Sequence, residues 1–178
     1  QLEIWAWDNH VDLALIQETL SNQCAVERRE NYTILFSGND SIEGDRTEAG
    51  VAIMIKNTHL NKIVDIDPVS DRLMAIRLRG TVTYTFVNTY MYTAEHPEKN
   101  PQQYQSLEEL VKKYKRGGPV YVGGDFNADI QSTDADTDQK VVGAHTFDRA
   151  NENELKDEAM IANRDELIEF CSKNCIYS

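Results

Sequence analysis

The chain has 178 residues, 40% of them hydrophobic, which is enough apolar material for one globular domain spanning residues 1–178. Its formal net charge of −12 excludes a protein whose whole surface binds a phosphate backbone, because such binding depends on Lys and Arg. Much of the excess is local, since residues 129–169 hold twelve Asp or Glu and four Lys or Arg. The remainder of the chain is therefore nearly balanced.

No apolar run approaches the roughly 20 residues of a membrane span, and no signal segment opens the chain. We therefore expect a soluble protein without a membrane partner, located in the nucleus or cytoplasm and not secreted. The three cysteines, at positions 24, 171 and 175, cannot all pair and complete no zinc pattern. We expect free, reduced thiols.

The first half of the chain predicts a short helix followed by strands. Residues 2–9 have the character of the last turns of a helix, and residues 39–48 are polar and contain glycine, as in a loop. Gly80 supplies the turn of a predicted hairpin. The predicted strands are residues 11–16, 50–55, 73–78 and 82–88.

The second half predicts a helix, a strand and a final helix. Asn100 is placed to cap the first helix, Pro101 to occupy its first position and Gly117 to end it. A strand follows at residues 120–123, and Asn163 with Glu166 forms a capping box before the last helix. The order predicts an α/β (α+β) sandwich with mostly antiparallel sheets.

The most specific local pattern is Gly-Gly-Asp-Phe-Asn at residues 123–127, where the predicted strand ends. In strand geometry the side chains of Asp125 and Asn127 point to the same face. The carboxylate can hold a metal ion or orient a water, and the amide can donate to a phosphate oxygen without adding negative charge. An ordinary Asx turn with permissive glycines explains the pattern equally well.

Glu18 is the second candidate, because it follows the buried apolar run at residues 13–16. A single Glu after a strand is usually only solvated. Mg²⁺, however, is commonly held by one or two carboxylates, with water and substrate phosphate completing its coordination. The position therefore indicates a possible magnesium ligand.

Together these segments resemble the exonuclease/endonuclease/phosphatase (DNase I-like) superfamily. The resemblance is carried by residues 12–19, 50–52, 87–90 and 122–128, whose order and spacing fit. It implies a four-layer α/β sandwich and hydrolysis of phosphoesters with Mg²⁺, with Mn²⁺ as the alternative ion. It also implies that Glu18 binds the metal, Tyr90 contacts the phosphate, Asp125 orients water and Asn127 donates to a phosphate oxygen.

A narrower resemblance, to the endonuclease domain of non-LTR retrotransposon endonuclease/reverse-transcriptase proteins, rests on residues 68–73 and 163–171. It implies DNA, or alternatively RNA, as substrate, with Arg72 among the residues that bind it. Arg164 stands where that subgroup usually has a glycine. An acidic insertion is expected at about residues 132–162.

The chain also departs from the superfamily pattern at both ends. The first strand with its Asn, and the closing Trp, Asp and Ser-Asp-His segments, have no counterpart in the sequence. We therefore expect an incomplete sandwich, inactive as this fragment, with sheet edges exposed to self-association. His10, His59, His96 and His145 are expected to be surface or loop residues.

Several alternatives remain. A phosphatase acting on phosphorylated lipid or inositol would have the same fold, and a catalytically silent fragment or binding module would keep the fold without the reaction. The Asp-rich segment at residues 134–138 departs from a calcium loop at two positions and is expected to be solvated. The basic cluster at residues 112–116 is expected to serve a helix end in preference to a phosphate backbone.

Overall fold

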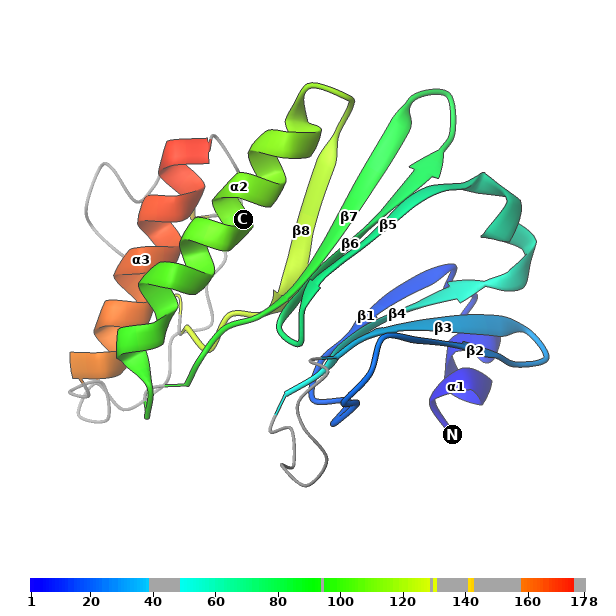
Figure 1. The fold of residues 1–178 in the computed structure, drawn as a ribbon, viewed down its shortest axis with the longest axis horizontal. Coiled ribbons are helices and arrows are strands. Elements are labelled where there is room, and N and C mark those ends of the chain that lie inside the picture. Colours follow the sequence, from blue (N-terminus) through cyan, green and yellow to red (C-terminus); the bar gives the residue numbers. More distant parts are fainter. Residues whose placement is uncertain (39–48, 94, 129, 131–140, 143–157, 175–178) are drawn as a thin grey trace. The chain divides into compact units, whose positions relative to one another are not determined.

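The computed structural model describes residues 1–38, 49–93, 95–128, 130, 141–142 and 158–174 (Figure 1). The chain forms two compact units. The sheet unit comprises Gln1–Tyr90 and Val111–Asp125, and the helical unit comprises Met91–Leu110 and Phe126–Ser178. Each unit is described by itself.

The sheet unit contains two four-stranded sheets. The first is fully antiparallel, in the order β1 (Leu13–Ile16), β4 (Val51–Lys56), β3 (Tyr32–Ser37) and β2 (Ala25–Arg28). The second has the order β5 (Ile63–Ser70), β6 (Leu73–Arg79), β7 (Thr83–Tyr90) and β8 (Val120–Asp125). Only its β7–β8 pairing is parallel among these described strands. A parallel pair needs a long crossover, and the chain between β7 and β8 includes helix α2 (Asn100–Lys115).

The main core lies between the two sheets. Ile53 and Ile55 of β4 pack in one cluster with Met74 and Ile76 of β6, and all four are fully buried. A strand buried on both faces is expected to be a continuous apolar run, as β4 is. Burying a large aliphatic side chain contributes about 1.5–3 kcal/mol, so this cluster dominates the stability of the sandwich.

Helical elements contact part of the outer face of each sheet. Helix α1 (Leu2–Asp8) buries Ala6 against Tyr32 and Met54 of the first sheet. At the second sheet, the Tyr114 hydroxyl near the end of α2 donates to Asp67 at 2.9 Å. The 3-10 helix η1 (Asn57–Lys62) connects the sheets. Within this unit the layers are therefore helix, sheet, sheet and helix end, as the resemblance implied.

The helical unit pairs the N-terminal part of α2 with α3 (Glu158–Asn174), after a short 3-10 helix, η2 (Pro97–Lys99). The rings of Tyr104 and Phe170 lie 5.7 Å apart, and Lys173 bonds Glu108 at 3.0 Å. None of the helices in the described part of the chain is long and apolar enough to cross a membrane.

The structure confirms the predicted fold class and the predicted strands. It adds β2, β3 and β5, which the sequence reading did not predict. In β5, Pro68 and the acidic residues Asp65 and Asp67 interrupt the apolar pattern, and β2 is exposed along its length. The prediction of a helix end for the basic cluster is also met, because α2 ends at Lys115.

Two predicted helix caps are wrong. Asn100 has helical backbone angles inside the helical run, and its amide bonds Tyr92 at both the main-chain nitrogen and oxygen. Asn163 lies within α3, which begins five positions earlier at Glu158. Both side chains are buried and bond each other at 2.8 Å. Their polarity serves long-range contacts, which a local capping pattern cannot distinguish from a cap.

Other expectations fall partly outside the described residues. These include the loop at 39–48, the acidic segment at 134–138, His145 and Cys175. Of the expected insertion, residues 158–162 belong to α3. Cys24 and Cys171 are free thiols, as expected.

Candidate functional site

The side chain of Glu18 is held by Tyr90. Glu18 follows β1 and has a left-handed backbone, with φ of 56°, which is uncommon for a residue with a side chain. The Tyr90 hydroxyl donates to Glu18 Oε1 at 2.9 Å. Tyr90 is only 6% exposed. Burial, followed by the hydrogen bond to Glu18, raises the pKa of Tyr90, so this hydroxyl stays a neutral donor.

Arg72 lies over the other side of this tyrosine. Its guanidinium carbon is 4.6 Å from the centroid of the Tyr90 ring, within the range of a cation–π contact. The backbone fixes the approach, because the Tyr90 amide donates to the Arg72 carbonyl at 2.9 Å. The Arg72 amide in turn donates to the Ser70 hydroxyl at 3.1 Å. A cation and a carboxylate thus flank one buried ring.

Asp125 reaches the same edge through the parallel pairing of β8 with β7. Its register partner is Tyr90, and its negative charge contributes, after burial and Glu18, to the raised pKa of that tyrosine. Two glycines allow the close approach. A side chain on Gly124, whose φ is 145°, would collide with the Thr89 carbonyl, and one on Gly123 would lie 2.8 Å from the Leu15 methyl.

The prediction that Asp125 and Asn127 share a strand face is wrong. Strand β8 ends at Asp125, and Asn127 has a left-handed φ of 46°. Asn127 belongs to the helical unit, where its side-chain amide donates to the Met91 carbonyl at 2.8 Å. The Asn127 carbonyl accepts from the Asn163 amide at 3.0 Å. The described Asn127 amide therefore anchors main chain within its own unit.

Two polar residues of this region, Gln17 and Asn88, were not among the predicted site residues. The Gln17 amide donates to Asn88 Oδ1 at 2.5 Å, and Asn88 is completely buried in the middle of β7. A buried polar side chain is normally hydrogen-bonded, so an Asn inside an apolar strand is the signal that was available. Its partners are set by the pairing of distant segments.

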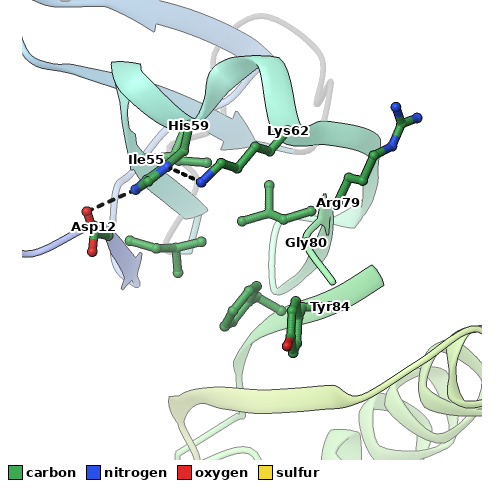
Figure 2. Close-up of a pocket in the computed structure, with 10 residues that line it drawn as sticks. Asp12, Ile55, His59, Lys62, Arg79, Gly80 and Tyr84 are labelled. Atoms are coloured by element: carbon green, nitrogen blue, oxygen red, sulfur yellow. Dashed lines mark hydrogen bonds and ion pairs between the residues drawn. The ribbon is translucent and has the colours of Figure 1, made fainter. Parts of the chain in front are cut away.

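A described pocket lies at the opposite end of the sandwich (Figure 2). It has a volume of about 240 Å³, and its apolar floor is formed by Leu13, Ile55, Leu78 and Phe86. At its edge, His59 Nε2 lies 3.0 Å from Asp12 Oδ1, and Lys62 Nζ lies 3.0 Å from His59 Nδ1 (Figure 2). Strand β1 starts here and ends near Glu18, so this pocket is separate from the Glu18 edge.

Comparison with known protein families assigns the chain to one of them. The model of the Endonuclease/Exonuclease/phosphatase family matches residues 2–156, most of the chain. The chain belongs to the Endonuclease/Exonuclease/phosphatase family. The matched range includes Glu18, Arg72, Tyr90 and Asp125.

Solved structures similar to this family member include three of TDP2 from Caenorhabditis elegans. The structure of selenomethionine TDP2 has a TM-score of 0.49 and 18% identity, over 71% of this chain and 40% of that chain. A truncated TDP2 has a TM-score of 0.48 and 18% identity, over 68% and 52%. A third structure has a TM-score of 0.49 and 17% identity, over 71% and 41%. This family member thus spans about half, or less, of those chains. No curated protein sequence matches it.

The oxygen atoms around Glu18 are ligands of the kind that a hard divalent cation such as Mg²⁺ prefers. Glu18 is an exposed carboxylate, and Tyr90 donates to its Oε1 and not to its Oε2. Mg²⁺ is commonly bound through one or two carboxylates and several waters, so it does not require a dense ligand cluster. Among the described residues, no group of three or more His, Cys, Asp or Glu side chains is placed to hold a metal.

Proposed function

We propose that this protein hydrolyses phosphodiester bonds in nucleic acid by metal-assisted attack of water. The proposal rests on three groups that meet where their strands end. The Glu18 carboxylate lies 2.9 Å from the neutral Tyr90 hydroxyl, and the Arg72 guanidinium lies over the Tyr90 ring. The register partner of that ring, Asp125, adds a second carboxylate. Such a combination can bind a phosphate and act on a water.

Glu18 is the proposed ligand of Mg²⁺, for which Mn²⁺ is the substitute to test. When bound, the ion neutralises phosphate charge and makes a coordinated water easier to deprotonate. Tyr90 holds Glu18 in position through its hydroxyl. Because the pKa of Tyr90 is raised, this hydroxyl remains a donor through the neutral pH range.

Arg72 and Asp125 are assigned complementary roles. A guanidinium binds phosphate oxygens well and is always charged, so Arg72 is the proposed phosphate-binding cation. Asp125 is exposed and is the proposed base that orients the attacking water and accepts its proton. Asn127 remains a proposed phosphate donor on the basis of the family motif alone.

DNA is the proposed substrate, with RNA as the alternative, and the retroelement type of endonuclease stays a prediction from residues 68–73 and 163–171. The related phosphatase hypothesis predicts a different product. If it is right, the protein releases inorganic phosphate from an inositol phosphate and does not cleave a nucleic-acid strand. Self-association through sheet edges also stays a prediction. It is checked by the molecular mass of the chain in solution.

The experiment is nicking of supercoiled plasmid with magnesium, with an EDTA control. Glu18→Gln and Asp125→Asn should each reduce the rate about 100-fold or more, as expected when a metal ligand or a base is removed. The matched control is Asp12→Asn, which changes a carboxylate at the other end of β1. It should nick within about twofold of the wild type. Equal nicking by all four proteins contradicts the proposal for this chain. An absence of nicking by a folded wild type also contradicts it, and is the outcome expected for the catalytically silent alternative.

A further inference from the structure

Asn88 bridges the two sheets at the level of the candidate site. It is 0% exposed and lies in β7, two residues before Tyr90. Its amide nitrogen donates to the carbonyls of Ile16, at 2.9 Å, and Ala52, at 2.9 Å, which are paired residues of β1 and β4. Its side-chain oxygen accepts from Gln17. One side chain therefore joins β7 of the second sheet to two strands of the first.

This network uses both donors and the acceptor of Asn88. A buried amide left without partners is destabilising, whereas a fully bonded one gives a defined geometry. An apolar side chain in the same place would pack between the sheets without fixing how β1 lies along β7. The bonds thus set the relative position of the two strands, in addition to filling space.

Glu18 needs such a constraint because of its backbone. A left-handed conformation at a residue with a side chain is strained and persists only where its surroundings impose it. On the C-terminal side, the Thr19 and Leu20 amides donate to the carbonyls of Gly50, at 3.0 Å, and Ala49, at 2.9 Å. On the N-terminal side, the constraint is the bonding of Ile16 and Gln17 to Asn88.

We propose that Asn88, acting through Gln17 and the Ile16 carbonyl, is a positioning residue that fixes Glu18 against the Tyr90 hydroxyl; this inference rests on the proposed function. Asn88 does not touch substrate, because it is completely buried. It links the residues that immediately precede Glu18 to the strand that delivers Tyr90. Loss of the link should leave the fold in place and loosen the contact between these two side chains.

The test variant is Gln17→Met, because Gln17 is partly exposed and an unbranched apolar side chain fits a similar space. The matched control is Thr33→Val, which removes a side-chain bond to Asn57 of 2.8 Å elsewhere in the sheet unit. Tyr90 is followed by the NMR chemical shift of its ring carbon beside the hydroxyl at one neutral pH, because that shift responds to the hydrogen bond of the hydroxyl. Glu18→Gln marks the signal of a tyrosine that has lost the charged partner.

Gln17→Met should move that chemical shift toward its value in the Glu18→Gln protein, and Thr33→Val should leave it unchanged. The nicking rate of Gln17→Met should fall about tenfold in kcat with KM within about twofold, at a urea midpoint similar to that of Thr33→Val.

The inference is overturned if Gln17→Met keeps the wild-type chemical shift of Tyr90, or if Glu18→Gln does not alter it. Asn88→Leu, where it folds, should reproduce the result of Gln17→Met. An inactive wild type rejects the proposed function alone, because the chemical shift of Tyr90 still decides whether Asn88 positions Glu18.

Discussion

The two ends of the sheet sandwich each carry a carboxylate with a bonded partner. At one end, Tyr90 donates to Glu18 at 2.9 Å, and at the other His59 lies 3.0 Å from Asp12. The settings differ more than the distances. Both carboxylates are exposed, but their partners differ: Tyr90 is 6% exposed and belongs to a central strand, whereas the His59 side chain is 26% exposed and lies in a 3-10 connection.

The difference shows that a short hydrogen bond does not by itself define a functional group. At the Glu18 end, the partner Tyr90 is fixed by strand register, and the residue two positions before Glu18 is bonded to a buried amide. At the Asp12 end, exposure allows water to compete for both partners. Paired substitutions at the two ends therefore test whether rigidity, and not pairing alone, distinguishes the candidate site.

The largest difference is expected between Gly124→Ala and Gly80→Ala. At Gly124, the new methyl would collide with the Thr89 carbonyl in a left-handed backbone, so we expect a loss of about 3 kcal/mol or more in unfolding free energy. At Gly80, it meets a Tyr84 ring carbon at 2.8 Å, and that ring can rotate. There the expected loss is about 1 kcal/mol or less. Urea unfolding measures both, and equal losses would show that β8 accommodates the change.

A smaller effect is expected from removing single tyrosine hydroxyls. Tyr90→Phe deletes the bond that holds Glu18, and we expect about a tenfold lower rate of magnesium-dependent nicking, the size of effect seen for groups that orient a metal ligand. Tyr84→Phe, at the pocket end, should change the rate by about twofold at most. If both variants retain wild-type rates, the Tyr90 hydroxyl does not matter for the reaction.

The smallest effect concerns Asp12 and is a function of pH. The hydrogen bond with His59 is the largest cause that lowers the pKa of Asp12 below its ordinary value of 3.8. A lowered carboxyl pKa contributes stability that is present above pH 3.8 and is lost as pH falls through the folded-state pKa. Asp12→Asn should therefore destabilise the protein at neutral pH by about 1 kcal/mol or less, since the pair is exposed.

The check on this prediction is the difference in unfolding free energy between wild type and Asp12→Asn across acidic pH. The difference should disappear once Asp12 is protonated in the folded state. His59→Ala is the matched control, because it removes the same hydrogen bond from the other side. Its loss of unfolding free energy should depend on pH in the same way as that of Asp12→Asn. A difference that persists at the lowest pH would mean that Asp12 stabilises the fold without its charge.

Much of the fold was accessible from local pattern. The apolar run of β4, the hairpin of β6 and β7 and the strand before Asp125 are recognisable because buried strands and tight turns have composition signals of their own. Strand β5 was not recognisable from the sequence, because Pro68, Asp65 and Asp67 interrupt its apolar pattern. Those two carboxylates are accounted for by Tyr114, far along the chain.

The sequence by itself determined three candidate chemical groups. Glu18 and Asp125 were candidates because each follows a predicted strand, and Tyr90 was a candidate through the family resemblance. The register of β7 with β8, the contact of Arg72 with the Tyr90 ring and the burial of Asn88 were decided only by tertiary structure. The same holds for Asn100 and Asn163, whose amides bond each other across 63 positions of sequence. The physical reason is common to all of them: a polar group in the interior is satisfied by whatever partner the packing of distant segments brings within reach, and local periodicity carries no record of that partner.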